Sequence, residues 1–108
     1  MTIQERRHRL SKASYYGEIT ASFTACIKGK IPIFNDAEIF GSINKILIDT
    51  LNRWDCDAHV FLFMPDHCHL LIQGKTKNSD LLGFIKDFKQ RSGYWLSKRS
   101  LKAAATGK

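Results

Sequence analysis

The segment from Ala58 to Gly74 constrains the fold of this chain more than any other. An almost continuous apolar run, Ala58–Met64, is followed by Pro65-Asp66 and then by the alternating stretch His67–Ile72. A Pro-Asp pair between two apolar segments is typical of a tight turn, and both segments have the length of a strand. The sequence therefore predicts a β-hairpin whose first strand, apolar on both faces, is central in its sheet.

The second strand of this hairpin carries two histidines that are two residues apart. Because successive side chains of a strand point to opposite faces, His67 and His69 share one face, and Cys68, Leu70 and Ile72 share the other. Two imidazoles side by side on a rigid strand are suited to hold a metal ion. The same spacing is compatible with a half-buried structural pair, and spacing alone does not decide between the two.

Length and composition restrict the class of protein. The 108 residues predict a single domain, and no apolar stretch approaches the length of a membrane span. The polar N-terminus has no secretory signal, so we expect a cytoplasmic protein without a membrane partner. The three cysteines are widely spaced and form neither a paired-cysteine zinc motif nor a disulfide framework.

The charge of the chain favours a polyanionic partner. Lys and Arg number 17 against 10 Asp and Glu, which gives a net charge of +7. For a small domain this excess is typical of nucleic-acid binding, although a solvated basic surface has the same composition. The cations predicted to contact nucleic acid fall in a basic N-terminal arm (residues 1–14) and on a helix: Arg6, Arg7, Arg9, Lys86, Lys89 and Arg91.

The remaining segments show strand and helix patterns in turn. Residues 16–27 alternate between polar and apolar and predict a half-buried strand. Asn35 or Asp36 is expected to cap a helix whose apolar positions recur every three or four residues as far as Trp54. Ser79 is expected to cap a second, similarly patterned helix, and residues 100–108 are expected to form a frayed tail.

The predicted order is strand, helix, strand, tight turn, strand and helix. This is an α+β order that matches most of a ferredoxin-like split β-α-β sandwich, in which an antiparallel sheet has its helices on one face. The chain ends where a fourth strand would follow, so that strand is expected to be missing. An open sheet edge usually needs a cover or a partner, and we therefore expect a homodimer.

Several motifs together resemble a known family. Met64–Ile72 resembles the His-hydrophobic-His (HUH) signature of the single-tyrosine transposases of bacterial insertion sequences, most of all those associated with repetitive extragenic palindromes. Gly29–Phe34 is similar to the turn before the first helix of that family, and Phe84–Gly93 is similar to its Lys-rich helix. The similarity extends from Arg6 to Leu96, which is nearly the whole chain.

The resemblance implies a function on single-stranded DNA, often folded as a hairpin. It implies that His67 and His69 hold a magnesium or manganese ion, with a third polar ligand, at the scissile phosphate. A tyrosine then attacks the phosphate and forms a covalent phosphotyrosine, from which strands are rejoined. In the family this tyrosine lies on a helix after the fourth strand. Tyr15, Tyr16 and Tyr94 do not match that position, so the nucleophile is unassigned.

Some assignments stay open at the level of sequence. Asp66, Gln73 and His59 are the candidates for the third metal ligand. Of these, Asp66 is expected to point away from the histidines and to shape the turn. The chain is a transposase-like strand-transfer domain, a non-catalytic nucleic-acid-binding relic, or a metal-dependent phosphodiesterase that uses water. Whether it is a fragment, and whether it is active, is also left open.

Overall fold

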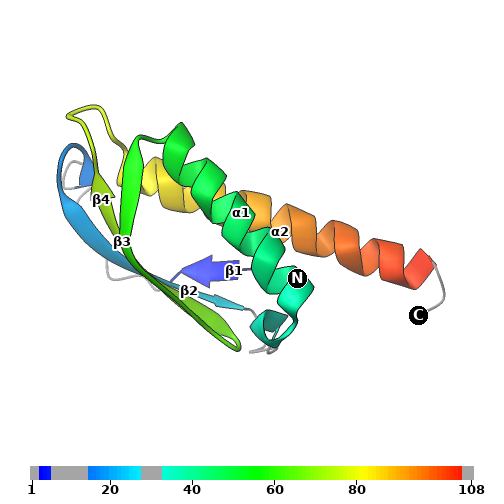
Figure 1. Cartoon of the computed structure of the whole chain (residues 1–108). Coiled ribbons are helices and arrows are strands. Elements are labelled where there is room, and N and C mark those ends of the chain that lie inside the picture. The colour runs from blue at the N-terminus through cyan, green and yellow to red at the C-terminus, as the bar shows by residue number, and fades with distance from the viewer. Residues whose placement is uncertain (1–2, 6–14, 28–32, 106–108) are drawn as a thin grey trace.

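The structure of the chain is a computed structural model in which residues 3–5, 15–27 and 33–105 are described. Their elements, in chain order, are β1 (Ile3–Glu5), β2 (Thr20–Ile27), the 3-10 helix η3 (Ile33–Asn35), α1 (Ala37–Arg53), β3 (Cys56–Met64), β4 (His67–Gly74) and α2 (Leu81–Ala105). Both α-helices lie against the same face of the sheet, and α2 extends well beyond the end of α1 (Figure 1). Neither helix, within the described residues, is long and apolar enough to cross a membrane.

The sheet has the strand order β1-β2-β4-β3, and every neighbouring pair is antiparallel. Because β2 and β3 are both antiparallel to β4, they run parallel to each other, and α1 forms the crossover between them. The predicted α+β class, with an antiparallel sheet and helices on one face, is confirmed. As expected, no strand follows α2 within the described residues.

The edge beside β2, where the missing fourth strand would lie, is partly occupied. Residues Ile3–Glu5 pair there with Ala25–Ile27, although they belong to the segment predicted as a basic arm. Three residues are too few to show a strand period in the sequence. They form a strand because the edge of β2 presents unpaired backbone N–H and C=O groups with which they can pair.

The prediction that Ala58–Met64 is a central strand is wrong. β3 lies at the edge of the sheet, and β4 takes the position between β2 and β3. Val60, Phe61 and Leu62 are all exposed in β3. Both faces of this edge strand carry apolar side chains. A strand that is buried on both faces has the same pattern in the sequence, so the two cannot be told apart there.

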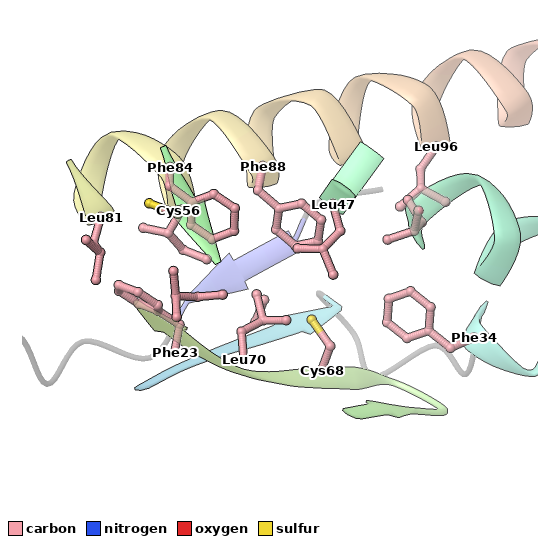
Figure 2. Close-up of a cluster of buried hydrophobic side chains, with 14 of the residues drawn as sticks. Phe23, Phe34, Leu47, Cys56, Cys68, Leu70, Leu81, Phe84, Phe88 and Leu96 are labelled. Atoms are coloured by element: carbon pink, nitrogen blue, oxygen red, sulfur yellow. The ribbon is translucent and has the colours of Figure 1, made fainter. Parts of the chain in front are cut away.

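The core lies between the sheet and the two helices. Leu70 and Cys68 of β4 point from the sheet toward Phe84 and Phe88 of α2, as Figure 2 shows. From α1 the buried side chains are Ile39, Ile43, Leu47 and Thr50. The predicted alternation along β4 is confirmed, because Cys68, Leu70 and Ile72 are buried on the helix side.

The helix boundaries differ in part from those expected. Asp36 caps α1, where its Oδ1 accepts from the backbone N–H groups of Glu38 and Ile39 at 2.9 and 3.2 Å. The N-cap of α2 is Asp80 rather than Ser79, since Asp80 Oδ1 accepts from Gly83 N–H at 2.9 Å. The helix also continues to Ala105, through residues predicted to fray. Leu, Lys and Ala in that stretch are strong helix formers.

Ser79 instead organises the loop at one end of the sheet. Its hydroxyl donates to Asp55 O at 2.5 Å and accepts from the N–H of Lys75 at 3.0 Å. Gly74, the last residue of β4, lies directly against the backbone of Gly17 in the same region. A Cβ on Gly74 would fall on the Gly17 carbonyl oxygen, so this contact requires glycine.

We predict opposite effects for two glycine substitutions. Gly74→Ala should destabilise the chain by about 2 kcal/mol or more, because the backbone of Gly17 must move to admit the methyl group. Gly41→Ala is the matched control, since nothing lies within 4 Å of its Cβ in α1. It should stabilise the chain by roughly 0.5–1 kcal/mol. Urea unfolding followed by circular dichroism measures both, and equal effects would contradict the described contact.

Candidate metal and nucleic-acid site

His67 and His69 lie on the face of the sheet that the helices leave open. The predicted placement is confirmed, with His67 half-buried and His69 exposed. Their ring centroids are 4.8 Å apart, with one ring edge-on to the other. In the register of the sheet, Met64 and Leu62 of β3 lie opposite the two histidines, and Thr24 of β2 lies opposite His69.

Each histidine has its Nδ1 engaged by a neighbour. The Oδ1 atom of Asp66 lies 2.6 Å from Nδ1 of His67. The hydroxyl oxygen of Thr24 lies 3.1 Å from Nδ1 of His69. Since each ring has only two nitrogens, Nε2 is the donor that remains on both histidines for a metal ion.

This donor set fits a divalent metal ion held by two adjacent ligands. Imidazoles bound side by side to one ion through Nε2–metal bonds of about 2.1 Å place their ring centres roughly 5 Å apart. Among the described residues, no group of three or more His, Cys, Asp and Glu side chains comes together as a metal site. The remaining coordination positions would therefore fall to water, to substrate oxygens or to groups outside those residues.

Two of the three candidates for a third metal ligand, His59 and Gln73, lie away from the His pair. His59 and Gln73 bond to each other through Nε2 and Oε1. Gln73 pairs with Thr20 and Asp57 near the far end of β4, away from the two histidines. Neither residue is therefore placed beside the His pair.

Asp66 differs from expectation. It was expected to point away from the histidines, but its carboxylate contacts the His67 ring. The residue belongs to the tight turn, where the alternation of a strand does not apply. The only signal in the sequence was its direct adjacency to His67.

Cys68 lies between the histidines in sequence but behind them in space. Its side chain is buried on the helix side of the sheet, and burial raises the pKa of its thiol to about 12. The thiolate is the form of cysteine that binds metals. A neutral thiol on the opposite face is therefore not part of this site.

None of the three tyrosines lies beside the histidines. Tyr15 is buried against Phe23, with ring centroids 6.1 Å apart. Tyr16 forms a bridge with Asp80 at the other end of the sheet, where the negative charge of that carboxylate raises the pKa of the phenol. Tyr94 is exposed on α2, which covers the opposite face of the sheet.

The predicted DNA-contacting cations that the structure describes do not gather around the His pair. Arg6, Arg7 and Arg9 lie outside the described residues, and Lys86, Lys89 and Arg91 belong to α2, on the other side of the sheet. Arg91 of α2 links the two helices through side-chain hydrogen bonds to α1. Its guanidinium donates to Asp49 Oδ2 at 2.5 Å and to the hydroxyl of Thr50 at 3.0 Å.

An exposed stripe runs along α2, and the spacing of Lys86, Gln90 and Tyr94 in the sequence predicts most of it. Lys86, Gln90, Tyr94 and Lys98 recur every four residues and are all exposed. The Lys98 ammonium lies 5.5 Å from the centre of the Tyr94 ring, a cation–π arrangement. The four-residue spacing was the available signal, because such residues share one helix face.

Two comparisons with known proteins gave a match. The family model described as "Transposase IS200 like" matches residues 15–107. One solved structure, a REP-associated tyrosine transposase bound to a REP hairpin, matches with a TM-score of 0.69 and 12% sequence identity. The match covers 85% of this chain and 53% of that one, so the chain spans about half the length of the solved protein. A comparison with curated proteins gave no match.

The family match covers most of the chain, and the chain therefore belongs to the IS200-like transposases. This confirms the family that the His-hydrophobic-His signature indicated. At its low sequence identity, the structural match establishes the fold that the two proteins share.

Proposed function

We propose that this chain is the metal- and DNA-binding part of a transposase that cuts and rejoins single-stranded DNA. The observation that carries the proposal is the pair of imidazoles on the open face of the sheet, with both Nδ1 atoms engaged by neighbours. Membership of the IS200-like family and a related fold in a structure bound to a REP hairpin support it.

In the proposed mechanism, His67 and His69 would hold magnesium or manganese through Nε2. An ion bound there would supply Lewis-acid polarisation of the scissile phosphate. The open face of the sheet accepts the DNA strand, since the helices leave that side uncovered (Figure 1). Imidazole is a softer ligand than magnesium prefers, so manganese suits the pair better.

The covalent step needs a tyrosine that these residues do not place at the site. A phenolic oxygen forms the new bond to phosphorus, the bond from phosphorus to the leaving sugar oxygen breaks, and that oxygen takes up a proton as a free hydroxyl. Tyr16 and Tyr94 are at the wrong end and the wrong side of the sheet. We therefore propose that a tyrosine from outside this sequence completes the reaction.

The cleavage test uses this chain together with a tyrosine donor. The donor is a full-length IS200-like transposase whose two signature histidines are replaced by alanine. With labelled hairpin DNA and manganese, the mixture should give a covalent protein–DNA adduct on a denaturing gel. His67→Ala should abolish the adduct. His59→Ala is the matched control, because that histidine lies on the same sheet away from the pair, and it should leave the adduct intact.

The other outcomes distinguish the rival functions. Nicking by this chain alone, without an adduct, would identify a phosphodiesterase that uses water. Hairpin binding without cleavage in any mixture would identify a binding-only relic. Either result would overturn the proposed strand transfer.

We further propose that Lys86 contacts DNA phosphate. It is exposed at the start of the α2 stripe, whereas Arg91 is already paired with Asp49. Lys86→Gln should weaken binding of hairpin DNA and reduce the slope of log K against log salt by about 0.7–0.9. Lys45→Gln is the control, because it removes the same charge from an exposed position of α1. Equal losses in both variants would indicate a general charge effect instead.

We also propose that the chain forms a homodimer through the outer edge of β3. Among the described residues, six of the eight exposed large apolar side chains belong to β3 or α1: Phe40, Ile48, Val60, Phe61, Leu62 and Met64. Residues 60–64 carry no charge. A second copy of a chain with net charge +7 would meet least repulsion at such an uncharged edge, and an antiparallel β3–β3 pairing is self-complementary.

The dimer prediction is tested by placing a charge on the uncharged, apolar edge of β3. Phe61→Lys should give a monomer in analytical ultracentrifugation, because two like charges would face each other across the two-fold axis. Tyr94→Lys makes a comparable change at the exposed surface of α2 and should leave the dimer intact. A wild-type chain that stays monomeric at the highest soluble concentration would rule out this interface.

A further inference from the structure

We propose that Asp66 is a positioning residue that fixes His67 in the tautomer required for metal binding, whereas Thr24 leaves the tautomer of His69 undetermined. The use of Nε2 as the metal donor rests on the proposed function. The assignment of the tautomer rests on the contacts alone.

The argument for His67 follows from the chemistry of its neighbour. A neutral imidazole carries one N–H, on either Nδ1 or Nε2, and an ionised carboxylate is only an acceptor. With Asp66 Oδ1 at 2.6 Å from Nδ1, the proton of the ring must lie on Nδ1 to make this hydrogen bond. Nε2 is then left with a lone pair directed away from the carboxylate, as a metal donor needs.

The neighbour of His69 imposes no such choice. The hydroxyl of Thr24, 3.1 Å from Nδ1, can accept a proton from the ring or donate its own. Only the first arrangement frees Nε2 for a metal ion. Thr24 therefore orients the ring of His69 but does not fix its tautomer. Asp66 fixes the tautomer of His67, so the two histidines differ in how far their neighbours ready them for metal binding.

The turn that carries Asp66 keeps the carboxylate in place. Met64 and His67 close the hairpin on either side, and the carbonyl of Pro65 accepts from the N–H of Phe34 at 3.0 Å. Nδ1 and Nε2 lie on different sides of the ring, so a carboxylate bonded to Nδ1 is not placed to bind the same ion. Asp66 therefore acts through His67 and is not itself a third ligand.

The decisive measurement is the tautomer of each histidine in the metal-free, DNA-free protein. Long-range proton–nitrogen NMR correlations distinguish Nδ1–H from Nε2–H in a neutral imidazole. At a pH where both rings are neutral, His67 should be in the Nδ1–H form, and His69 should show a substantial Nε2–H population. A wild-type His67 in the Nε2–H form overturns the proposal without any variant.

Two substitutions test which neighbour acts on which ring. Asp66→Asn keeps the size and the turn preference but adds a donor, so His67 should lose its single tautomer while the signals of His69 stay in place. Thr24→Val should alter only His69. A change in both rings in either variant would indicate general disturbance of the sheet and would overturn the assignment.

Metal binding provides a second readout that does not depend on catalysis. Titration with manganese alone, followed by line broadening of the histidine signals, should show about tenfold weaker binding or more for Asp66→Asn. Unchanged affinity would contradict the positioning role. Failure of the cleavage assay would leave the tautomer result unaffected, so the two proposals fail separately.

Discussion

Antiparallel pairing of β4 with a strand on each side is the constraint on which the rest of this structure depends. Seven residue pairs fix the register against β2, from Thr20–Gln73 to Cys26–His67. A slip of one residue would turn both histidines toward the helices and would expose Cys68, Leu70 and Ile72. The burial of Cys68, Leu70 and Ile72 therefore also determines where the imidazoles point.

This arrangement divides the molecule into two surfaces with different characters. The open face of the sheet holds the histidines, the Thr24 hydroxyl and the side chains of Val60, Leu62 and Met64 of β3. The cationic stripe of α2 lies beyond the core, on the opposite side. A nucleic acid that used both would have to pass around the edge of the sheet. The sequence could not reveal this separation, because residues on different elements acquire relative positions only in the folded chain.

The sequence was most informative where a local period reports directly on burial. The two-residue period of β4 and the three- to four-residue period of both helices predicted the core and the shared face of the histidines. It failed for Ala58–Met64, because an apolar run does not record which strands flank it. It also failed for Asp66, whose contact depends on turn geometry. The contact of Arg91 with Asp49 could not be read from the sequence either, because the two residues are far apart in the chain.

The histidines lie on a face of the sheet that neither described helix covers, and this has a consequence for how such genes change over time. Residues that face away from the core contribute little to stability, so their replacement is not opposed by loss of the fold. A copy that lost His67 or His69 would still fold and could persist as a protein without its chemistry. By the same reasoning, the residues around the pair are free to vary in response to new DNA targets, while the opposite side of the same strand is held constant by packing.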